Sequence, residues 1–160
     1  LIAIARRVGV DMSLEDWDAV LTLNLDATFF LTQAVAGPML ARGRGKVINI
    51  ASMLSFQGGI RVAAYTASKS AIAGITRGLA NEWAGRGLNV NAIAPGYVAT
   101  RNTQALREDE GRSREILARI PQGRWATPQD LGGAAVFLAS AASDYVNGAI
   151  LPVDGGWLAR

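Results

Sequence analysis

The sequence predicts an α/β fold, specifically the C-terminal portion of a doubly wound parallel sheet with helices on both faces. Segments of helical periodicity alternate with short apolar runs, in the order helix, strand, helix, strand, helix, strand. The strands are almost continuously apolar, as expected for strands buried on both faces. Three strands leave an unpaired parallel edge, which is why we expect only the second half of a larger sheet.

The first helix is expected from residue 13 to about residue 42. Ser13 is a suitable N-cap, carboxylates follow in the first turn, and apolar residues then recur at three- and four-residue steps. Pro38 is expected to bend this helix, and Gly43 follows its end. The β-branched run over residues 46–52 then predicts a buried strand.

The remaining elements continue the alternation. A second helix, rich in alanine, is closed by glycines, and a second strand is stopped by Pro95-Gly96. Thr127 followed by Pro128 predicts the start of a third helix. The expected ranges are a helix over 64–84, a strand over 88–94, short amphipathic helices within 97–126, a helix over 128–139 and a strand over 149–153.

Composition excludes several classes of function. The 160 residues contain no Cys and no His, which excludes disulfides, Cys/His zinc sites and every mechanism that needs a catalytic histidine. The 16 basic residues are scattered over a chain of net charge +3, so no nucleic-acid partner is expected. No eighteen consecutive residues are apolar, so no membrane span is expected. No metal site is expected, because the acidic run over 108–110 lacks the spacing of a calcium loop.

Tyr65 and Lys69 form the sharpest pair of reactive side chains. They are four residues apart, so on a helix they lie on one face, one turn apart. An ammonium about 4 Å from a phenol, at an effective dielectric of about 20, favours phenolate by about 4 kcal/mol. That equals about three pKa units, enough to bring a tyrosine toward neutral pH. The alternative is an exposed Tyr and Lys that share helical spacing without a role.

Ser52 and Pro95-Gly96 add a second observation. Each follows a predicted strand, and the carboxyl ends of parallel strands meet at one edge of a sheet, where open α/β sheets bind ligands. Ser52 also lies thirteen residues before Tyr65. A hydroxyl there can bind a reacting oxygen, or it can bond the local backbone.

Five motifs then occur in one order and spacing: Leu23-Asn24-Leu25, Asn49-Ile50-Ala51-Ser52, Tyr65-x-x-x-Lys69, Pro95-Gly96-Tyr97-Val98-Ala99-Thr100 and Val153-Asp154-Gly155-Gly156. Together they resemble the short-chain dehydrogenase/reductase family, whose fold is Rossmann-type, over essentially the whole chain. The resemblance implies an NAD(P)-dependent oxidoreductase, with NAD as the expected cofactor and NADP also open.

The resemblance also implies roles for individual residues. Tyr65 is the implied general acid/base, and Lys69 lowers the pKa of Tyr65 and holds the nicotinamide ribose. Ser52 orients the substrate oxygen, and Asn24 holds a water in the proton relay. Asn24 could instead be satisfied within its helix, and Thr100 could be a helix cap. The implied cofactor-binding residues are Tyr65, Lys69, Pro95, Gly96, Val98 and Thr100, and the implied substrate-binding residues are Ser52, Met53, Arg61, Tyr65, Tyr97 and Thr103.

Further stretches are similar to the branch of the family that acts on deoxy and keto-deoxy sugar acids. They span residues 51–62, 81–84, 102–104, 119–125 and 154–160. The implied reaction is reversible oxidation of a secondary alcohol. A sugar-acid carboxylate needs a cation, and Arg61 is the first candidate because it lies four residues before Tyr65. Other candidates are Arg6, Arg7, Arg101, Arg112 and Arg119, and the alternative for each arginine is a solvated surface position.

Residues 1–160 are expected to form a single, incomplete domain. The family's Gly-x-x-x-Gly-x-Gly loop, which cradles the cofactor pyrophosphate, is expected to precede Leu1. One alternative is a truncated, non-enzymatic remnant or assembly module, and another is a different family member such as a 3-oxoacyl-carrier-protein reductase. A cytoplasmic homo-tetramer is expected, assembled through the helices over 13–42 and 64–84 and through the last strand.

Overall fold

Three parallel strands form one sheet in the computed structural model, which describes residues 9–160. The strands are β1 (Gly45–Ile50), β2 (Leu88–Pro95) and β3 (Ile150–Val153), and they lie in that order across the sheet. Gly45 is in register with Leu88, and Ala92 is in register with Ile150. The predicted parallel α/β fold is therefore confirmed.

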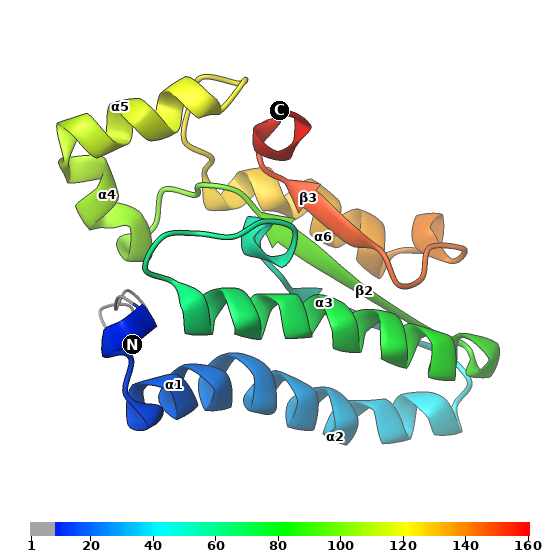
Figure 1. Cartoon of the computed structure of the whole chain (residues 1–160). Coiled ribbons are helices and arrows are strands. Elements are labelled where there is room, and N and C mark those ends of the chain that lie inside the picture. Colours follow the sequence, from blue (N-terminus) through cyan, green and yellow to red (C-terminus); the bar gives the residue numbers. More distant parts are fainter. Residues whose placement is uncertain (1–8) are drawn as a thin grey trace.

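Helices cover both faces of this sheet (Figure 1). Helices α2 (Ala27–Ala41) and α3 (Ala63–Trp83) lie on one face, and α6 (Gly132–Ala139) lies on the other. Val47 and Val90 point toward α3 and pack against Leu79. Alternate strand positions point toward α6 and the 3₁₀ turn Ala141–Ser143 that follows it, where Lys46 donates to the Ser143 hydroxyl. The core therefore consists of strand side chains on both sides of the sheet.

The first helical run begins as predicted but is interrupted at a different place. Ser13 caps α1 (Leu14–Leu21), because its hydroxyl accepts a hydrogen bond of 3.1 Å from the Asp16 N–H. A π-helical turn, Thr22–Asp26, then leads into α2. Helix α2 continues through Pro38, so the departure from α geometry lies at the π turn. A π turn is defined by hydrogen bonds between residues i and i+5, and no residue pattern in the sequence predicts where such a turn forms.

Shorter helices follow β2, as predicted. The 3₁₀ turn Arg101–Thr103 leads into α4 (Gln104–Glu108) and α5 (Glu110–Arg119). The third predicted helix begins with a 3₁₀ turn, Pro128–Leu131, and becomes α-helical only in α6. Met53, Ile116, Ile120 and Trp157 form a buried cluster that joins α5 and the C-terminal tail to the turn after β1.

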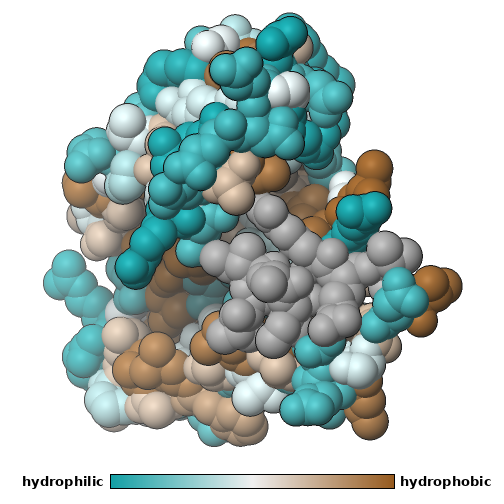
Figure 2. Space-filling view, turned by 90° about the vertical axis from the view of Figure 1, so that its left-hand side faces the viewer, coloured by the Kyte–Doolittle hydropathy of each residue, from teal (hydrophilic) through white to brown (hydrophobic). Residues whose placement is uncertain are grey.

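The run Leu14–Ala41 is long and apolar enough to cross a membrane by length and composition alone. Polar residues such as Asn24, Asp26 and Gln33 interrupt this run, so the sequence expectation, which concerned eighteen consecutive apolar residues, is not contradicted by it. Several of its large side chains are exposed, including Phe30 at 62% and Leu31 at 67%. In Figure 2 hydrophobic atoms gather at the lower part of the view, the side of α1 and α2, and hydrophilic atoms predominate above, the side of α4 and α5.

Candidate active site

The carboxyl ends of β1 and β2 bring three of the predicted residues together. Ser52 lies two residues beyond β1 and is buried, while Tyr65 and Lys69 lie in the first two turns of α3. A hydrogen bond joins the side chains of Ser52 and Tyr65. The Lys69 ammonium lies 5.7 Å from the centroid of the Tyr65 ring. A substrate oxygen at this edge can therefore meet a hydroxyl and a phenol at once.

Ser52 bonds the local backbone, which was one of its two alternative interpretations. Its extended backbone ends the strand, and its Oγ accepts a hydrogen bond of 3.2 Å from the Leu54 N–H. A serine hydroxyl has one proton and two lone pairs, so that bond leaves the proton available for Tyr65 or a substrate. The backbone contact fixes the hydroxyl without consuming its donor.

Tyr65 is a weaker acid here than in water. Burial raises the pKa of its phenol, and the hydrogen bond with Ser52 lowers that pKa by less than burial raises it. The expectation that Lys69 brings the pKa toward neutrality is wrong for this arrangement. The Lys69 Nζ donates to the carbonyl of Ile50 at 2.7 Å rather than to the phenol. Tyr65 is therefore protonated at neutral pH and suited to donate a proton to a ketone oxygen.

The pKa of Lys69 also differs from its ordinary value. Burial lowers the pKa of its ammonium, and among residues 9–160 no carboxylate pairs with it. One of its three N–H donors binds Ile50. The remaining donors can bind hydroxyl groups of a ligand at the same edge of the sheet.

Asn24 lies inside the π turn between α1 and α2, which packs against α3. Its carbonyl accepts a hydrogen bond of 2.8 Å from the Thr28 hydroxyl. Single π turns inside α-helices occur frequently at functional sites. The turn thus adds a structural signal to a position that the sequence singled out only through its resemblance.

The loop after β2 is held by close contacts. Gly96 passes so near Asp154 that a Cβ on it would lie 2.6 Å from the Asp154 Cα, so only glycine fits. The Thr103 hydroxyl donates to the Val98 carbonyl at 2.6 Å and accepts from the Thr100 N–H at 3.1 Å. Thr100 therefore has the helix-cap position that was its alternative interpretation, and Thr103 braces the loop.

Met53 and Tyr97 contribute apolar surface beside the reactive residues. Met53 is buried in the cluster that joins α5 to the tail. The Tyr97 ring lies 5.4 Å from that of Trp125 and 4.8 Å from that of Trp157. These contacts hold the Tyr97 ring in place, because aromatic pairs prefer such edge-on and tilted geometries.

The candidate arginines differ in their surroundings. Arg61 is exposed and has a left-handed backbone with φ of 61°, a conformation that costs a non-glycine residue about 1 kcal/mol. Arg112 pairs with Glu115 at 2.7 Å, and the guanidinium of Arg119 lies 3.9 Å from the centre of the Trp157 ring. Arg6 and Arg7 lie outside the described residues. Arg61 and Arg101 form no ion pair within residues 9–160.

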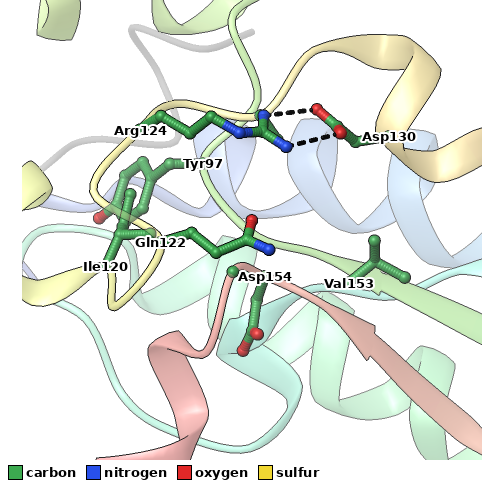
Figure 3. A pocket seen from close by; sticks show the side chains of 9 residues that line it. Tyr97, Ile120, Gln122, Arg124, Asp130, Val153 and Asp154 are labelled. Atoms are coloured by element: carbon green, nitrogen blue, oxygen red, sulfur yellow. Dashed lines mark hydrogen bonds and ion pairs between the residues drawn. The ribbon is translucent and has the colours of Figure 1, made fainter.

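A small pocket of about 40 Å³ lies beside Tyr97 and Asp154 (Figure 3). Arg124 and Asp130 at its rim point toward each other and form an ion pair of 2.8 Å. Ligand sites for drug-sized molecules are of the order of 300 Å³ or more, so this pocket fits water rather than a sugar acid. Ser52, Tyr65 and Lys69 do not line it. Within residues 9–160 no three metal-ligating side chains cluster.

Sequence reasoning missed Ser55. Its hydroxyl donates to the carbonyl of Lys69 at 2.6 Å and accepts from the Ser52 N–H at 3.3 Å. The pattern Ser-x-x-Ser directly after a strand has the spacing of a capping box, in which side chain and backbone bond reciprocally. That spacing could have identified Ser55, but its bond to Lys69 depends on the tertiary fold.

The sequence matches a known family model and several characterised relatives. The family model described as enoyl-(acyl carrier protein) reductase matches residues 1–158. The chain is 65% identical over 158 residues to 2-dehydro-3-deoxy-D-gluconate 5-dehydrogenase of Dickeya dadantii, covering 98% of this chain and 62% of that protein. It is 46% identical over 154 residues to gluconate 5-dehydrogenase of Gluconobacter oxydans, covering 96% of this chain and 60% of that protein.

Solved structures agree. A Beutenbergia cavernae protein, assigned as an NAD(P)-dependent gluconate 5-dehydrogenase and solved with bound NADP, superimposes with a TM-score of 0.96 at 61% identity, over 98% of this chain and 63% of that one. A gluconate 5-dehydrogenase from Burkholderia cenocepacia, in complex with NADP and tartrate, gives a TM-score of 0.95 at 44% identity, over 97% of this chain and 61% of that one. The chain therefore spans less than two thirds of the length of these relatives.

Proposed function

The chain belongs to the short-chain dehydrogenase/reductase family, and from this premise we propose that it carries the catalytic and substrate-binding part of an NAD(P)-dependent sugar-acid dehydrogenase. The reaction interconverts a secondary alcohol and a ketone on a deoxy or keto-deoxy sugar acid. The observation that carries this proposal is the contact of Ser52 with Tyr65, one turn from Lys69, at the carboxyl edge of the sheet.

Tyr65 is the proton-transfer group in this reaction. As a protonated phenol it donates to the ketone oxygen during reduction, and as phenolate it removes the hydroxyl proton during oxidation. Ser52 holds the same oxygen with its free hydroxyl proton. Because the Ser52 bond stabilises phenolate, it makes the loss of the Tyr65 proton less costly.

The residues at this edge fit a nicotinamide nucleotide. The N–H donors of Lys69 beyond the one bound to Ile50 suit two ribose hydroxyls. Gly96 lets the loop after β2 lie directly against Asp154, which fixes the end of the strand where the nicotinamide is expected. The nicotinamide supplies the hydride acceptor when bound. NADP in two related structures supports it as a cofactor beside NAD, and we place the pyrophosphate loop outside these 160 residues.

The substrate class follows from the relatives and from Arg61. Relatives at 60% to 65% identity are named for 2-dehydro-3-deoxy-D-gluconate, a sugar acid. One related structure holds tartrate, a hydroxy acid. Arg61 lies on the segment between Ser52 and Tyr65 and has no ion-pair partner among residues 9–160, and we assign its guanidinium to the substrate carboxylate.

Assembly and location complete the function. Exposed apolar side chains on the π turn and α2, among them Leu23, Phe30, Leu31 and Val35, suit burial against a second copy of the chain. A homo-tetramer built on these helices, on α3 and on β3 agrees with this surface. The same burial accounts for an apolar helical run without any membrane. A metabolic dehydrogenase of this kind works as a soluble, cytoplasmic enzyme.

Turnover of sugar acids by a Tyr65→Phe variant tests the function. Nicotinamide absorbance is expected to show a loss of about a hundredfold to ten-thousandfold in kcat, because proton transfer is lost while the ring keeps its packing. Tyr145→Phe is the matched control, since Tyr145 is fully exposed. Arg61→Ala should raise KM for sugar acids but not for neutral polyols. Normal turnover by Tyr65→Phe would overturn the assignment.

A further inference from the structure

We propose that Ser55 is a positioning residue that holds the Ser52 hydroxyl against the Tyr65 phenol by fastening the turn after β1 to helix α3. This inference rests on the proposed function, since it gives Ser55 a part in the same proton transfer. Ser55 touches neither the phenol nor the ammonium. It acts through the backbone of Ser52 and of Lys69.

The bonds of Ser55 run in two directions. Its hydroxyl donates to the backbone carbonyl of Lys69 at 2.6 Å and accepts from the backbone N–H of Ser52 at 3.3 Å. One oxygen atom thereby connects the residue that presents the reactive hydroxyl with the helical turn next to Tyr65. The shorter bond is to α3, so the helix is the fixed support and the turn is fastened to it.

The placement of Ser52 depends on that support. Residues 53–55 form a single 3₁₀ turn, which has no helix of its own to hold it. Besides its contact with Tyr65, Ser52 Oγ accepts a hydrogen bond from the Leu54 N–H, which belongs to the same turn. Without the bond from Ser55 to α3, the turn keeps its internal bonds but loses this link to the helix that carries Tyr65. The Ser52–Tyr65 distance is then less strictly held.

Ser70 provides a matched control. Its hydroxyl donates to the Leu54 carbonyl at 3.3 Å, so it also bridges the same turn and the same helix. It is exposed and makes no bond to Ser52. Removing Ser70 therefore weakens the attachment of the turn in general, whereas removing Ser55 frees the N–H of Ser52 in particular.

The consequence is a change in the acidity of Tyr65. The Ser52 bond stabilises phenolate, so a looser Ser52 raises the pKa of the phenol. In Ser55→Ala the pH profile of alcohol oxidation should move upward by about one unit, and kcat at neutral pH should fall about tenfold. Ser55→Thr keeps a hydroxyl and should restore most of both. Ser70→Ala should leave the profile in place.

The experiment combines kcat–pH profiles with a titration that needs no substrate. Ultraviolet difference titration of Tyr65, taken as each protein minus its Tyr65→Phe counterpart, should show the same upward shift in Ser55→Ala alone. An unshifted titration in folded Ser55→Ala overturns the inference, and so does an equal shift in Ser70→Ala. If no sugar acid is turned over by a protein that carries this chain together with the pyrophosphate loop, the proposed function fails, while the titration still decides the role of Ser55.

Discussion

The two lysines of the chain lie at opposite ends of the same sheet and have opposite surroundings. Lys46, near the amino end of β1, pairs with Asp144 at 2.7 Å and also donates to the Ser143 hydroxyl. Lys69, beyond the carboxyl end of β1, has a backbone carbonyl as its partner and no carboxylate within residues 9–160. Burial lowers the pKa of Lys69, while the bond from Lys46 lowers the pKa of Asp144.

The polar groups around each lysine repeat the difference. At the amino end Asn91 and Asn147 each bond the backbone through one amide N–H and the amide oxygen, so both ends of each amide are held by the fold. At the carboxyl end the Ser52 hydroxyl contacts the Tyr65 phenol, and Lys69 keeps two N–H donors beyond the one bound to Ile50. The comparison shows that the carboxyl end of the sheet differs from the amino end in having hydrogen-bond donors available for a ligand, and not in the types of its residues.

The largest expected difference is in kcat/KM between substitutions of the two lysines. Lys69→Met is expected to lower kcat/KM for a sugar acid by about a hundredfold or more, because it removes the ammonium beside Tyr65. Lys46→Met should stay within about threefold, since its partner Asp144 is largely exposed and the pair lies at the other end of the sheet from Tyr65. Steady-state rates of both variants at one temperature check this. If kcat/KM fell equally in both variants, the carboxyl and amino ends of the sheet would not differ in function.

A middle effect concerns the structural edge. Asn91 is 1% exposed, and its amide bonds Val146 and Ala149 at 2.9 Å each. Asn91→Ala leaves the Ala149 N–H without its partner and removes one of the two amide donors to the Val146 carbonyl, so it should lower the free energy of unfolding by about 1–3 kcal/mol. Asn89→Ala, at a half-buried position, should cost less.

Urea unfolding of both variants measures the two losses, and kcat measured well below the unfolding midpoint serves as the functional readout. A turnover defect in Asn91→Ala under those conditions would show that the amino end of the sheet also serves catalysis.

The smallest effect is a pH dependence at the same edge. The Lys46 bond holds the pKa of Asp144 below its ordinary value of 3.8. The folded pKa is depressed, so the pair stabilises the fold above the unfolded pKa and loses that effect as pH falls through the folded pKa. The difference in melting temperature between the unmodified protein and Asp144→Asn should shrink below pH 3.8. A difference that stays constant down to acid pH would show that the charge of Asp144 is irrelevant.

Local patterns in the sequence determined much of this protein. The alternation of periodic segments predicted three parallel strands and the helices that cover them, because hydrophobic periodicity reflects which face each element buries. Ser13 and Thr127 predicted helix starts for the same local reason. The spacing of Tyr65 and Lys69 predicted one shared helix face, because that geometry is fixed within a single turn.

Contacts between distant segments were decided only by the tertiary structure. Lys69 turns to the Ile50 carbonyl and not to Tyr65, and Ser55 reaches across to α3. Arg119 is occupied by the Trp157 ring, while Arg61 stays exposed with a left-handed backbone. Each outcome depends on which of several polar partners lies nearest after folding. A periodic pattern predicts which face of a helix or strand is buried. The pairing of hydrogen-bond donors and acceptors depends on distances between elements, which no local pattern encodes.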